Sequence, residues 1–493
     1  MRMFKEAPVA AARTHPPSSF RSSPQPSAID TPVAGVAVIA GLIFASFLLP
    51  IDVQPRDGLR LPALLFSLSL CSVPVLAALR DPKSFFRAEH LLAMAPVFWL
   101  LLEPIQGRTD LDGVSREDVQ RSLAAIAIFV TGAWIAFVQR PWRAPEFVRS
   151  AARVELPTEA YFGIGVLAFI LAFLKYAVPA GFDFAAMASD LAGGRWAGAW
   201  NRGDLGGTDA FLDHLSYFGY LLPPLTVIVS RRLGWGNLRT LCLIFCGLIL
   251  SAFIIQQGGR RLVGMFFGSG FLFWFLGKPQ IRLSTILTLI LLVAGLWFTN
   301  EKILSYRNVG ILAMFDPDAT PHVSEDAMVR VDDNFLRLAQ TSAIFPELHP
   351  YTTWRYALWV AVRPVPRLFW PGKPVDPGFS LPQFLRQKGV SLSSSVIGEL
   401  MMAGGLLAVA LGGWFYGRLA RSLSHFLSEA RTSSALLIYS VGLFALFVGF
   451  RSMIELVLTS YIILGWVALV HIYHGFKVKQ ATLPVNPRPG RSW

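Results

Sequence analysis

Long apolar segments alternate with short polar connections along most of the 493-residue chain. A helix that crosses a bilayer needs roughly 17–25 mostly apolar residues. Because backbone polar groups must be paired inside hydrocarbon, such segments are predicted to be helices. Twelve segments fit: 32–49, 61–79, 90–105, 123–138, 161–178, 211–229, 238–255, 262–276, 283–298, 395–416, 434–450 and 453–471. The pattern predicts an all-α fold, a polytopic membrane helical bundle of about 12 transmembrane helices, in which the short third and eighth segments could also be re-entrant.

Composition agrees with a membrane protein. Hydrophobic residues make up 54% of the chain and charged residues 15%, whereas a soluble domain carries about a quarter charged residues. The formal net charge of +13 could indicate nucleic acid, but the basic residues lie in short loops between apolar segments and not on one face. We therefore expect membrane lipid, and no nucleic acid, as a partner.

Lys and Arg residues predict the orientation, because short cytoplasmic loops carry an excess of them. An even number of spans with basic loops on one side places both termini in the cytoplasm. The predicted division is a disordered cytoplasmic tail at 1–31, nine membrane helices in 32–299, a large external loop at 300–394, three helices in 395–472, and a cytoplasmic tail at 473–493.

The external loop is the least regular part of the chain. Loops of this length without secondary structure are uncommon and usually functional. Met328, Val331, Phe335 and Leu338 recur with helical spacing, which predicts a helix there. The segment 354–370 is rich in Trp, Tyr, Val and Arg and suits a helix lying in the membrane interface.

Several arginines are predicted on the external side, against the topological bias: Arg195, Arg202, Arg260, Arg261 and Arg451. A guanidinium binds phosphate through two parallel hydrogen bonds, so these residues are candidates for binding an anionic substrate. The alternative is that they extend to lipid headgroups. Glu455, four residues after Arg451, could be its partner on the same helix.

The end of the external loop carries further candidates. Arg363, Arg367 and Lys373 lie in and beside the proline-rich string of residues 364–374, which would fix their positions. Glu399 follows a serine cluster and falls about one turn inside the tenth segment. A carboxylate at that depth is a functional candidate by default, although it could also be the partner of an arginine.

Other chemistry has weaker support in the sequence. His349 is a single loop histidine, and such residues are more often idle than catalytic. The acid pairs Asp110 with Asp112 and Asp316 with Asp318 are too simple to indicate a metal site. We expect no metal and no cofactor.

Three strings in the second half of the chain resemble one family. PRLFWPGKP at 366–374, SSSVIGEL at 393–400 and IFPELHPYTTW at 344–354 resemble bacterial oligosaccharide repeat-unit polymerases of the Wzy type, which make O-antigen or exopolysaccharide. An arginine followed by ten residues and a glycine, found in some of these proteins, has matches at Arg195–Gly206 and Arg367–Gly378.

The resemblance implies a GT-C-like glycosyltransferase of the bacterial inner membrane with its large loop in the periplasm. It would transfer the growing glycan from one undecaprenyl pyrophosphate to a hydroxyl on another lipid-linked unit. In that role Glu399 would be the base, with His349 as second choice. Arg260, Arg261 and Arg451 would bind one pyrophosphate. Arg195, Arg202, Arg363, Arg367 and Lys373 would bind the other pyrophosphate or the glycan. A chain-length regulator and a flippase are the implied protein partners.

Two other functions remain open. An O-antigen ligase has similar architecture but gives the glycan to a lipid A core. A polysaccharide flippase or other transporter would have charged residues in the middle of many spans and an internal repeat. The sequence has few charged residues at mid-span, which favours a transferase.

Overall fold

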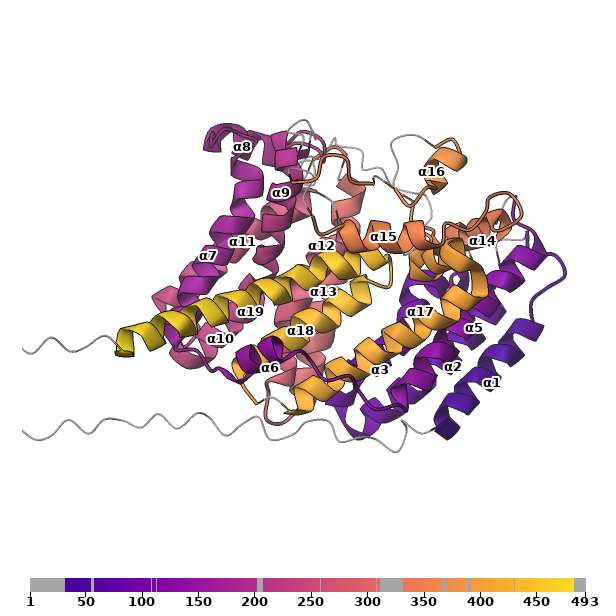
Figure 1. The fold of residues 1–493 in the computed structure, drawn as a ribbon, viewed down its shortest axis with the longest axis horizontal. Helices are drawn as coiled ribbons and strands as arrows, with labels where there is room; N and C mark the ends of the chain where they lie inside the picture. Colours follow the sequence, from indigo (N-terminus) through magenta and orange to yellow (C-terminus); the bar gives the residue numbers. More distant parts are fainter. Residues whose placement is uncertain are drawn as a thin grey trace, which may run out of the picture.

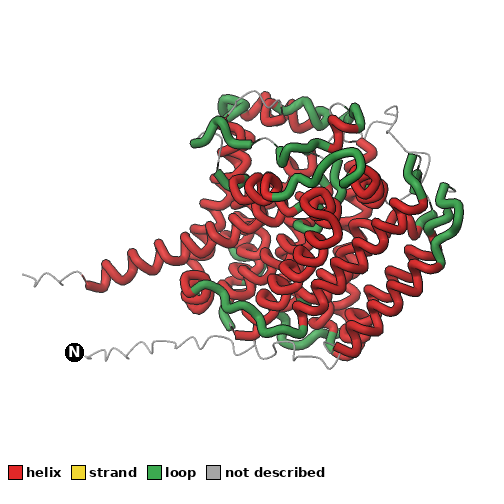
Figure 2. The backbone as a smooth tube through the Cα atoms, turned by 45° about the vertical axis from the view of Figure 1, so that its right-hand side comes forward, coloured by secondary structure: helices red, strands yellow, loops and turns green. Residues whose placement is uncertain are grey.

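The computed structural model describes residues 32–54, 57–107, 109–111, 113–201, 207–257, 259–306, 308–310, 331–365, 369–374, 376–387, 392–429 and 431–482. Within these ranges the chain forms α-helices joined by turns and short 3-10 and π segments, without a strand, which confirms the all-helical prediction for this part. Long helices run side by side at an inclination, and loops lie at the two ends of the bundle (Figures 1 and 2).

Seven helical stretches are long and apolar enough to cross a membrane, as a polytopic helical membrane protein requires. They are α2 (Arg60–Arg80), the stretch Ala88–Ile105, α5 (Arg116–Phe137), α7 (Thr158–Ala177), α11 (Leu238–Gln256), α17 (Ser395–Glu429) and the Met453–Gly475 part of α19 (Met453–Thr482). Shorter apolar stretches are α1 (Pro32–Phe47), Arg261–Leu276 of α12 (Arg260–Leu276), Leu283–Thr299 of α13 (Leu283–Tyr306) and α18 (Ser433–Val448). The total of twelve spans stays a prediction.

Three predicted segments are interrupted, one of them, 395–416, at Gly404 and Gly405. The stretch Ala88–Ile105 consists of α3 (Ala88–Pro96), a π segment at Val97–Leu101 and α4 (Leu102–Ile105). The π segment directly follows Pro96, which cannot donate a backbone hydrogen bond. The predicted span 211–229 is divided among α9 (Gly207–Ser216), the 3-10 segment Tyr217–Leu221 and α10 (Leu222–Leu233). Proline at the first positions of α10 accounts for the new start, since a proline there needs no intrahelical partner.

Helices α5 and α17 share the most extensive contact of any two helices in the described part of the chain. A Cβ atom added to Gly417 would lie 2.5 Å from the carbonyl oxygen of Ala133, and one added to Gly413 would collide with the carbonyl oxygen of Phe129. Gly132 on α5 faces the carbonyl oxygen of Ala410 in the same way. Small residues at these positions allow the two backbones to touch, as is common between membrane helices.

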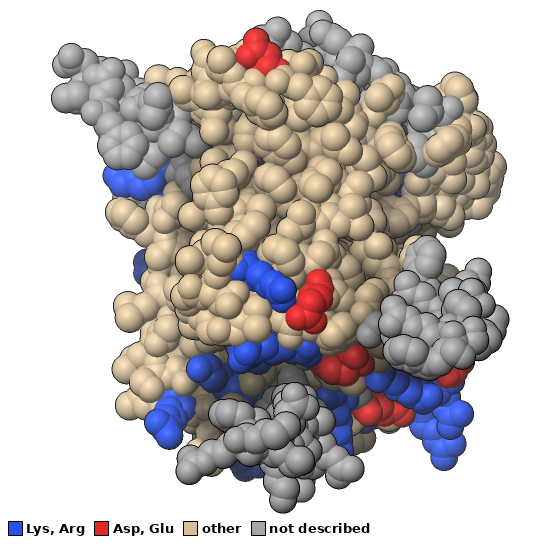
Figure 3. Space-filling model, turned by 90° about the vertical axis from the view of Figure 1, so that its left-hand side faces the viewer, with Lys and Arg blue, Asp and Glu red and all other residues tan. Residues whose placement is uncertain are grey.

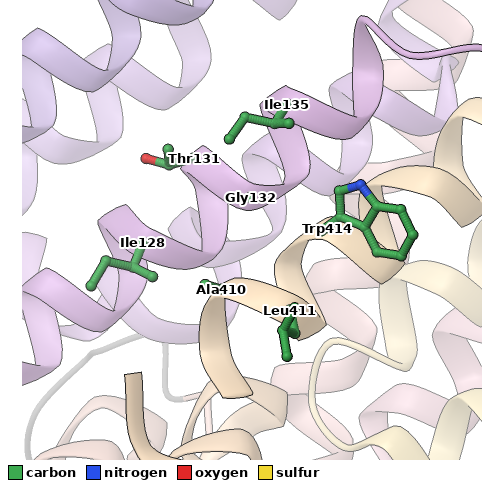
Figure 4. A pocket seen from close by; sticks show the side chains of 7 residues that line it. All are labelled: Ile128, Thr131, Gly132, Ile135, Ala410, Leu411 and Trp414. Carbon is green, nitrogen blue, oxygen red and sulfur yellow. The ribbon is translucent and has the colours of Figure 1, made fainter. Parts of the chain in front are cut away.

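The outer side of this contact carries an apolar hollow of about 300 Å³. Figure 4 shows side chains from the two helices around it: Ile128, Thr131, Gly132, Ile135, Ala410, Leu411 and Trp414. Leu411 is 60% exposed and Ile135 is 52% exposed. Exposed apolar residues of this kind are expected where a membrane protein faces lipid chains.

Basic loops far apart in the sequence meet at one end of the bundle, which we call the basic end. Figure 3 shows blue and red side chains gathered at the bottom of the molecule. There Glu89 pairs with Arg87 at 3.1 Å and with Arg421 at 3.2 Å, and Arg232 pairs with Glu155. The loops predicted to be cytoplasmic therefore share one end, and the compartment that this end faces stays a prediction.

Short helices gather at the opposite end, which we call the short-helix end (Figure 1). They are α8 (Phe184–Ala192), α9, α14 (Asn334–Ile344), α15 (Trp354–Val362) and α16 (Leu381–Phe384). The last three belong to the predicted external loop. Of the residues predicted to form a helix, Phe335 and Leu338 lie in α14, which begins at Asn334, whereas Val331 precedes it and Met328 lies outside the described residues. The helix α15 lies within the segment predicted to be interfacial.

Candidate functional site

A polar pocket of about 380 Å³ lies at the short-helix end. Its walls come from the start of α12, the end of α15, the loop around α16, the start of α17 and the turn between α18 and α19. The charged residues that line it are Arg261, Arg363, Asp376, Glu399, Arg451 and Glu455. Serine hydroxyls from Ser380, Ser393, Ser394 and Ser452 lie among them. The pocket therefore brings together four of the predicted site residues, Arg261, Arg363, Glu399 and Arg451.

An ion-pair chain fixes two of these arginines. Arg261 Nη1 lies 2.5 Å from Glu455 Oε1, and Arg451 Nη1 lies 3.9 Å from the same oxygen. On its other side, Arg451 Nε lies 3.0 Å from Asp332 Oδ2. The side chains of Arg451 and Glu455 are only 11% and 12% exposed. Since these side chains are largely enclosed, the two guanidinium groups are oriented before any ligand binds.

Arg363 differs from Arg261 and Arg451 in its contacts. It follows the last residue of α15 and forms no ion pair with the residues that the structure describes. Lys373 holds its turn in place, because the buried ammonium group donates to the carbonyl oxygens of Arg363 at 3.1 Å and Val365 at 2.6 Å. Lys373 does not line the pocket. Lys373 therefore holds the backbone beside Arg363, and the guanidinium of Arg363 can still bind an anion.

Glu399 joins three elements. Its Oε1 atom accepts a hydrogen bond of 2.6 Å from the hydroxyl of Ser452. Its Oε2 atom accepts one of 2.6 Å from the hydroxyl of Tyr356 and one of 2.8 Å from the backbone N–H of Met453. Met453 begins α19, so the carboxyl group caps the amino end of that helix, where negative charge is favourable. Both oxygens of Glu399 therefore have partners, from α15, from the turn before α19 and from the first residue of α19.

A break in α17 accommodates the loop above the pocket. Gly404 and Gly405 have non-helical backbone angles, with φ of −175° and 66°. The carbonyl groups of Met402 and Ala403 accept hydrogen bonds from the backbone N–H groups of Thr352 at 3.0 Å and Thr353 at 2.9 Å. The break thus frees two carbonyl groups for the segment that leads into α15, and α15 is held over the part of α17 that carries Glu399.

His349 lies behind the pocket wall. Its ring packs edge-on against Phe345 and Phe379, with centroids 5.3 Å and 5.0 Å away, and its Nδ1 atom is 2.7 Å from the carbonyl oxygen of Pro350. Phe379 lines the pocket, whereas His349 does not. The ring is thus held one layer away from the charged groups, and its predicted catalytic role stays a prediction.

The remaining predicted residues are not brought into the pocket. Arg195 lies in the loop after α8, with its guanidinium 4.8 Å from the ring centre of Trp196, and it is not a lining residue. Arg202 and Arg367 lie outside the described residues, and only the backbone of Arg260 is described. Of the acid pairs, Asp112, Asp316 and Asp318 also lie outside them.

Sequence reasoning missed four residues of the site. Asp332 is separated from Arg451 by more than a hundred positions, and nothing in the sequence marks it as the partner. Tyr356, Ser452 and Asp376 also gave no signal, because hydroxyl and acid residues are common in loops. Glu455 was assigned to Arg451, but its closer contact is with Arg261 on α12. Within the described ranges, no three His, Cys, Asp or Glu side chains are grouped as a metal site requires.

The site combines guanidinium groups and carboxylates at one surface. Such a combination can bind a phosphate-containing group and also accept a proton. Comparison of the chain with models of protein families, with curated proteins and with solved structures gives no match, so the arrangement itself is the basis for a functional assignment.

Proposed function

We propose that the protein is a membrane glycosyltransferase of the bacterial inner membrane that polymerises undecaprenyl-pyrophosphate-linked oligosaccharide repeat units. In this proposal the short-helix end faces the periplasm, both termini are cytoplasmic, and the architecture is of the GT-C kind. The observation that supports it best is the grouping of Arg261, Arg363 and Arg451 with Glu399 and Glu455 around one pocket.

The charge pattern of the pocket favours a reaction over simple capture of an anion. Guanidinium groups and carboxylates line it in equal number: Arg261, Arg363 and Arg451 against Asp376, Glu399 and Glu455. A site that only concentrates anions gains nothing from carboxylates, which repel them. A site for glycosyl transfer needs both, because the leaving pyrophosphate requires cations and the attacking hydroxyl requires a base.

The proposed reaction involves a lipid-linked donor, a lipid-linked acceptor and the charged side chains of the pocket. The pyrophosphate of the donor lies against Arg363, Arg261 and Arg451, which stabilise the charge that develops on the leaving group. A hydroxyl of the acceptor unit attacks the anomeric carbon of the donor glycan, and its proton passes to a carboxylate of the pocket. The bond from that carbon to the pyrophosphate oxygen breaks, and undecaprenyl pyrophosphate leaves with the electron pair. Pyrophosphate leaves readily as an anion, so the reaction needs no acid to protonate it.

The placement of the pocket suits a lipid-linked substrate. It lies where α12, α17 and α19 reach the short-helix end, so a polar headgroup can enter while its polyprenyl chain stays in the bilayer. A transporter would instead place charged residues along the middle of its spans. In the proposed pathway, a flippase delivers the lipid-linked units and a chain-length regulator acts with the polymerase.

Deletion of the gene tests the proposal. Electrophoresis of surface glycans should show loss of the ladder of polymer while single repeat units remain, and plasmid-borne protein should restore the ladder. Loss of single units as well, with the polymer made normally on its lipid carrier, would identify an O-antigen ligase that acts on a lipid A core. An unchanged ladder would refute both functions.

A further inference from the structure

Two carboxyl groups of the pocket lie beside the amino end of α19, and the structure distinguishes them. Glu399 accepts hydrogen bonds on both oxygens, from Ser452, Tyr356 and Met453. All three donors belong to the protein itself, so each oxygen of Glu399 already has a partner before a substrate binds. A base must have an oxygen free to receive a proton from the substrate. Glu399 is therefore better suited to hold α15, α17 and α19 together.

Glu455 has the free oxygen that Glu399 lacks. Its Oε1 atom lies 2.5 Å from Arg261 Nη1 and 3.9 Å from Arg451 Nη1, whereas its Oε2 atom accepts no hydrogen bond from the part of the chain that the structure describes. The side chain is 12% exposed and lines the pocket. Arg261 thus holds one oxygen of the carboxylate, with Arg451 nearby, while the other oxygen has no hydrogen-bond donor among the described residues.

We propose that Glu455 is the general base that deprotonates the acceptor hydroxyl, an inference that rests on the proposed glycosyl transfer. The proton passes from the acceptor hydroxyl to Oε2 of Glu455. The acceptor oxygen forms the new bond to the anomeric carbon, and the bond to the pyrophosphate oxygen breaks. The products are the extended glycan, undecaprenyl pyrophosphate and a protonated Glu455, which returns its proton to water before the next cycle.

The contact between Glu455 and Arg261 places the proposed base beside a cation that stabilises the leaving group. The guanidinium of Arg261 holds Oε1 and also lines the pocket, so it connects the proton acceptor to the group that leaves. A base within reach of the attacking hydroxyl while cations face the leaving group is the geometry that a direct displacement requires.

The variant Glu455→Gln tests the assignment. The amide keeps an oxygen that can accept from Arg261 but cannot take up a proton. Lipid-linked repeat units extracted from the native strain with the gene deleted serve as donor and acceptor for the purified, reconstituted protein. We expect kcat for polymerisation to fall about 100- to 10,000-fold, the usual contribution of a general base. Glu455→Asp should retain more activity than Glu455→Gln.

The affinity for undecaprenyl pyrophosphate distinguishes a catalytic role of Glu455 from a purely structural one. Glu455→Gln removes a negative charge next to Arg261 and Arg451, so the affinity for this anion should stay the same or increase. A thermal-shift titration with undecaprenyl pyrophosphate measures it, since a ligand that binds only the folded state raises the melting temperature. A lower affinity that accounts for the lost rate would overturn the proposal.

Two further variants separate basicity from charge balance. Asp332→Asn removes the other carboxylate paired with Arg451, so it should lower the rate far less than Glu455→Gln, and equal losses would show that Glu455 only balances charge. Glu347→Gln is the matched control, because Glu347 pairs with Arg121 at 3.3 Å on the same end of the molecule and lies outside the pocket. It should leave the rate unchanged.

The pH profile gives an independent readout. A carboxylate base loses activity as the pH falls and it becomes protonated, so the acidic limb of the wild-type profile should disappear in Glu455→Gln. Charged and titratable groups around Glu455 are Arg261 of α12, Arg451 of the preceding turn, and Tyr217 and Tyr220 of the 3-10 segment before α10. Arg363, Asp376 and Glu399 line the same pocket. An unaltered acidic limb would exclude Glu455 as the base.

The outcomes for the inference and for the underlying function are distinct. Failure of the wild-type protein to polymerise the extracted units would refute the proposed function itself. Polymerisation by the wild type and at a similar rate by Glu455→Gln would refute only the assignment of the base.

Discussion

The hydroxyl of Tyr356 donates a 2.6 Å hydrogen bond to Oε2 of Glu399 and thereby fastens α15 to α17. Tyr356 is buried, and together with Val360 it packs against Ile454 at the start of α19. This contact, with the backbone hydrogen bonds from Thr352 and Thr353 to the broken part of α17, decides where α15 ends and therefore where Arg363 lies. The pocket thus depends on a tyrosine that does not line it.

Replacement of Tyr356 by Phe should loosen α15. The change removes one buried hydrogen bond to a carboxyl group, which contributes about 1–3 kcal/mol. We expect faster amide hydrogen exchange in residues 354–362, measured by mass spectrometry. Tyr416→Phe is the control, since it removes the hydrogen bond from the Tyr416 hydroxyl to the carbonyl oxygen of Gly449 at 3.0 Å and should leave the exchange of α15 unchanged. Equal exchange of α15 in the wild type and Tyr356→Phe would contradict the prediction.

The same tyrosine predicts a pH dependence of stability. Burial, followed by the nearby carboxyl group of Glu399, raises the pKa of Tyr356 well above its ordinary value of 10.0. A group whose pKa is raised by folding contributes stability below its unfolded pKa and loses it as the pH rises towards the folded pKa. The difference in unfolding free energy between wild type and Tyr356→Phe should therefore be constant up to about pH 10 and shrink above it, by about 1.4 kcal/mol per pH unit. Denaturant unfolding at several pH values checks this.

The break in α17 depends on one glycine of the pair at 404–405. Gly405 has a φ of 66°, and a Cβ there would lie 2.6 Å from the hydroxyl oxygen of Tyr351. Gly405→Ala should lower the free energy of unfolding by about 1–3 kcal/mol, because a non-glycine residue is strained in this region. Gly404 has an extended φ of −175°, so Gly404→Ala should cost less. Equal melting temperatures for the two variants would contradict this account.

Much of the bundle could be predicted from the sequence because membrane helices need only length and apolar composition. Even the interruptions have local signals, such as Pro96 before the π segment and Gly404–Gly405 inside the predicted span 395–416. These signals indicate where a helix is broken, but they do not indicate which segment of the protein forms hydrogen bonds with the freed backbone groups. The pairing of the freed carbonyl groups with Thr352 and Thr353 is a tertiary contact that local composition does not encode.

The site could be predicted only in part for the same reason. Arg261 and Arg451 were recognisable because external arginines oppose the charge bias of the loops, and Glu399 because a carboxylate inside a span is rare. Their partners were not recognisable, because Asp332 and Tyr356 are ordinary loop residues until the fold places them beside Arg451 and Glu399. His349 and Lys373 were also candidates in the sequence, yet neither is among the residues that line the pocket. Which cations face the pocket is decided by packing.

Glu103 should control the position of Asp332. Its buried carboxyl group accepts hydrogen bonds from the backbone N–H groups of Val331 and Asp333, on either side of Asp332. Glu103→Ala would release this turn and weaken the ion pair between Asp332 and Arg451. We expect faster hydrogen exchange at residues 331–335 and a several-fold loss of polymer synthesis. Normal exchange in this turn together with lost activity would show that Glu103 acts by another route.

Arg363 should be the most informative of the pocket cations, because among the described residues it forms no ion pair that must first be broken. Arg363→Ala removes a guanidinium that stabilises the leaving pyrophosphate, and loss of one such stabilising group lowers kcat by about 100- to 1,000-fold. Arg355→Ala is the matched control: it removes the same charge from α15 at a position outside the pocket lining. Polymer length on gels and initial rates with extracted lipid-linked units measure both variants.

Arg363→Lys should recover part of the rate, since an ammonium group supplies the charge without the paired hydrogen bonds of a guanidinium. If Arg355→Ala and Arg363→Ala lower the rate equally, the positive charge of α15 attracts the substrate from a distance, and Arg363 does not contact the pyrophosphate.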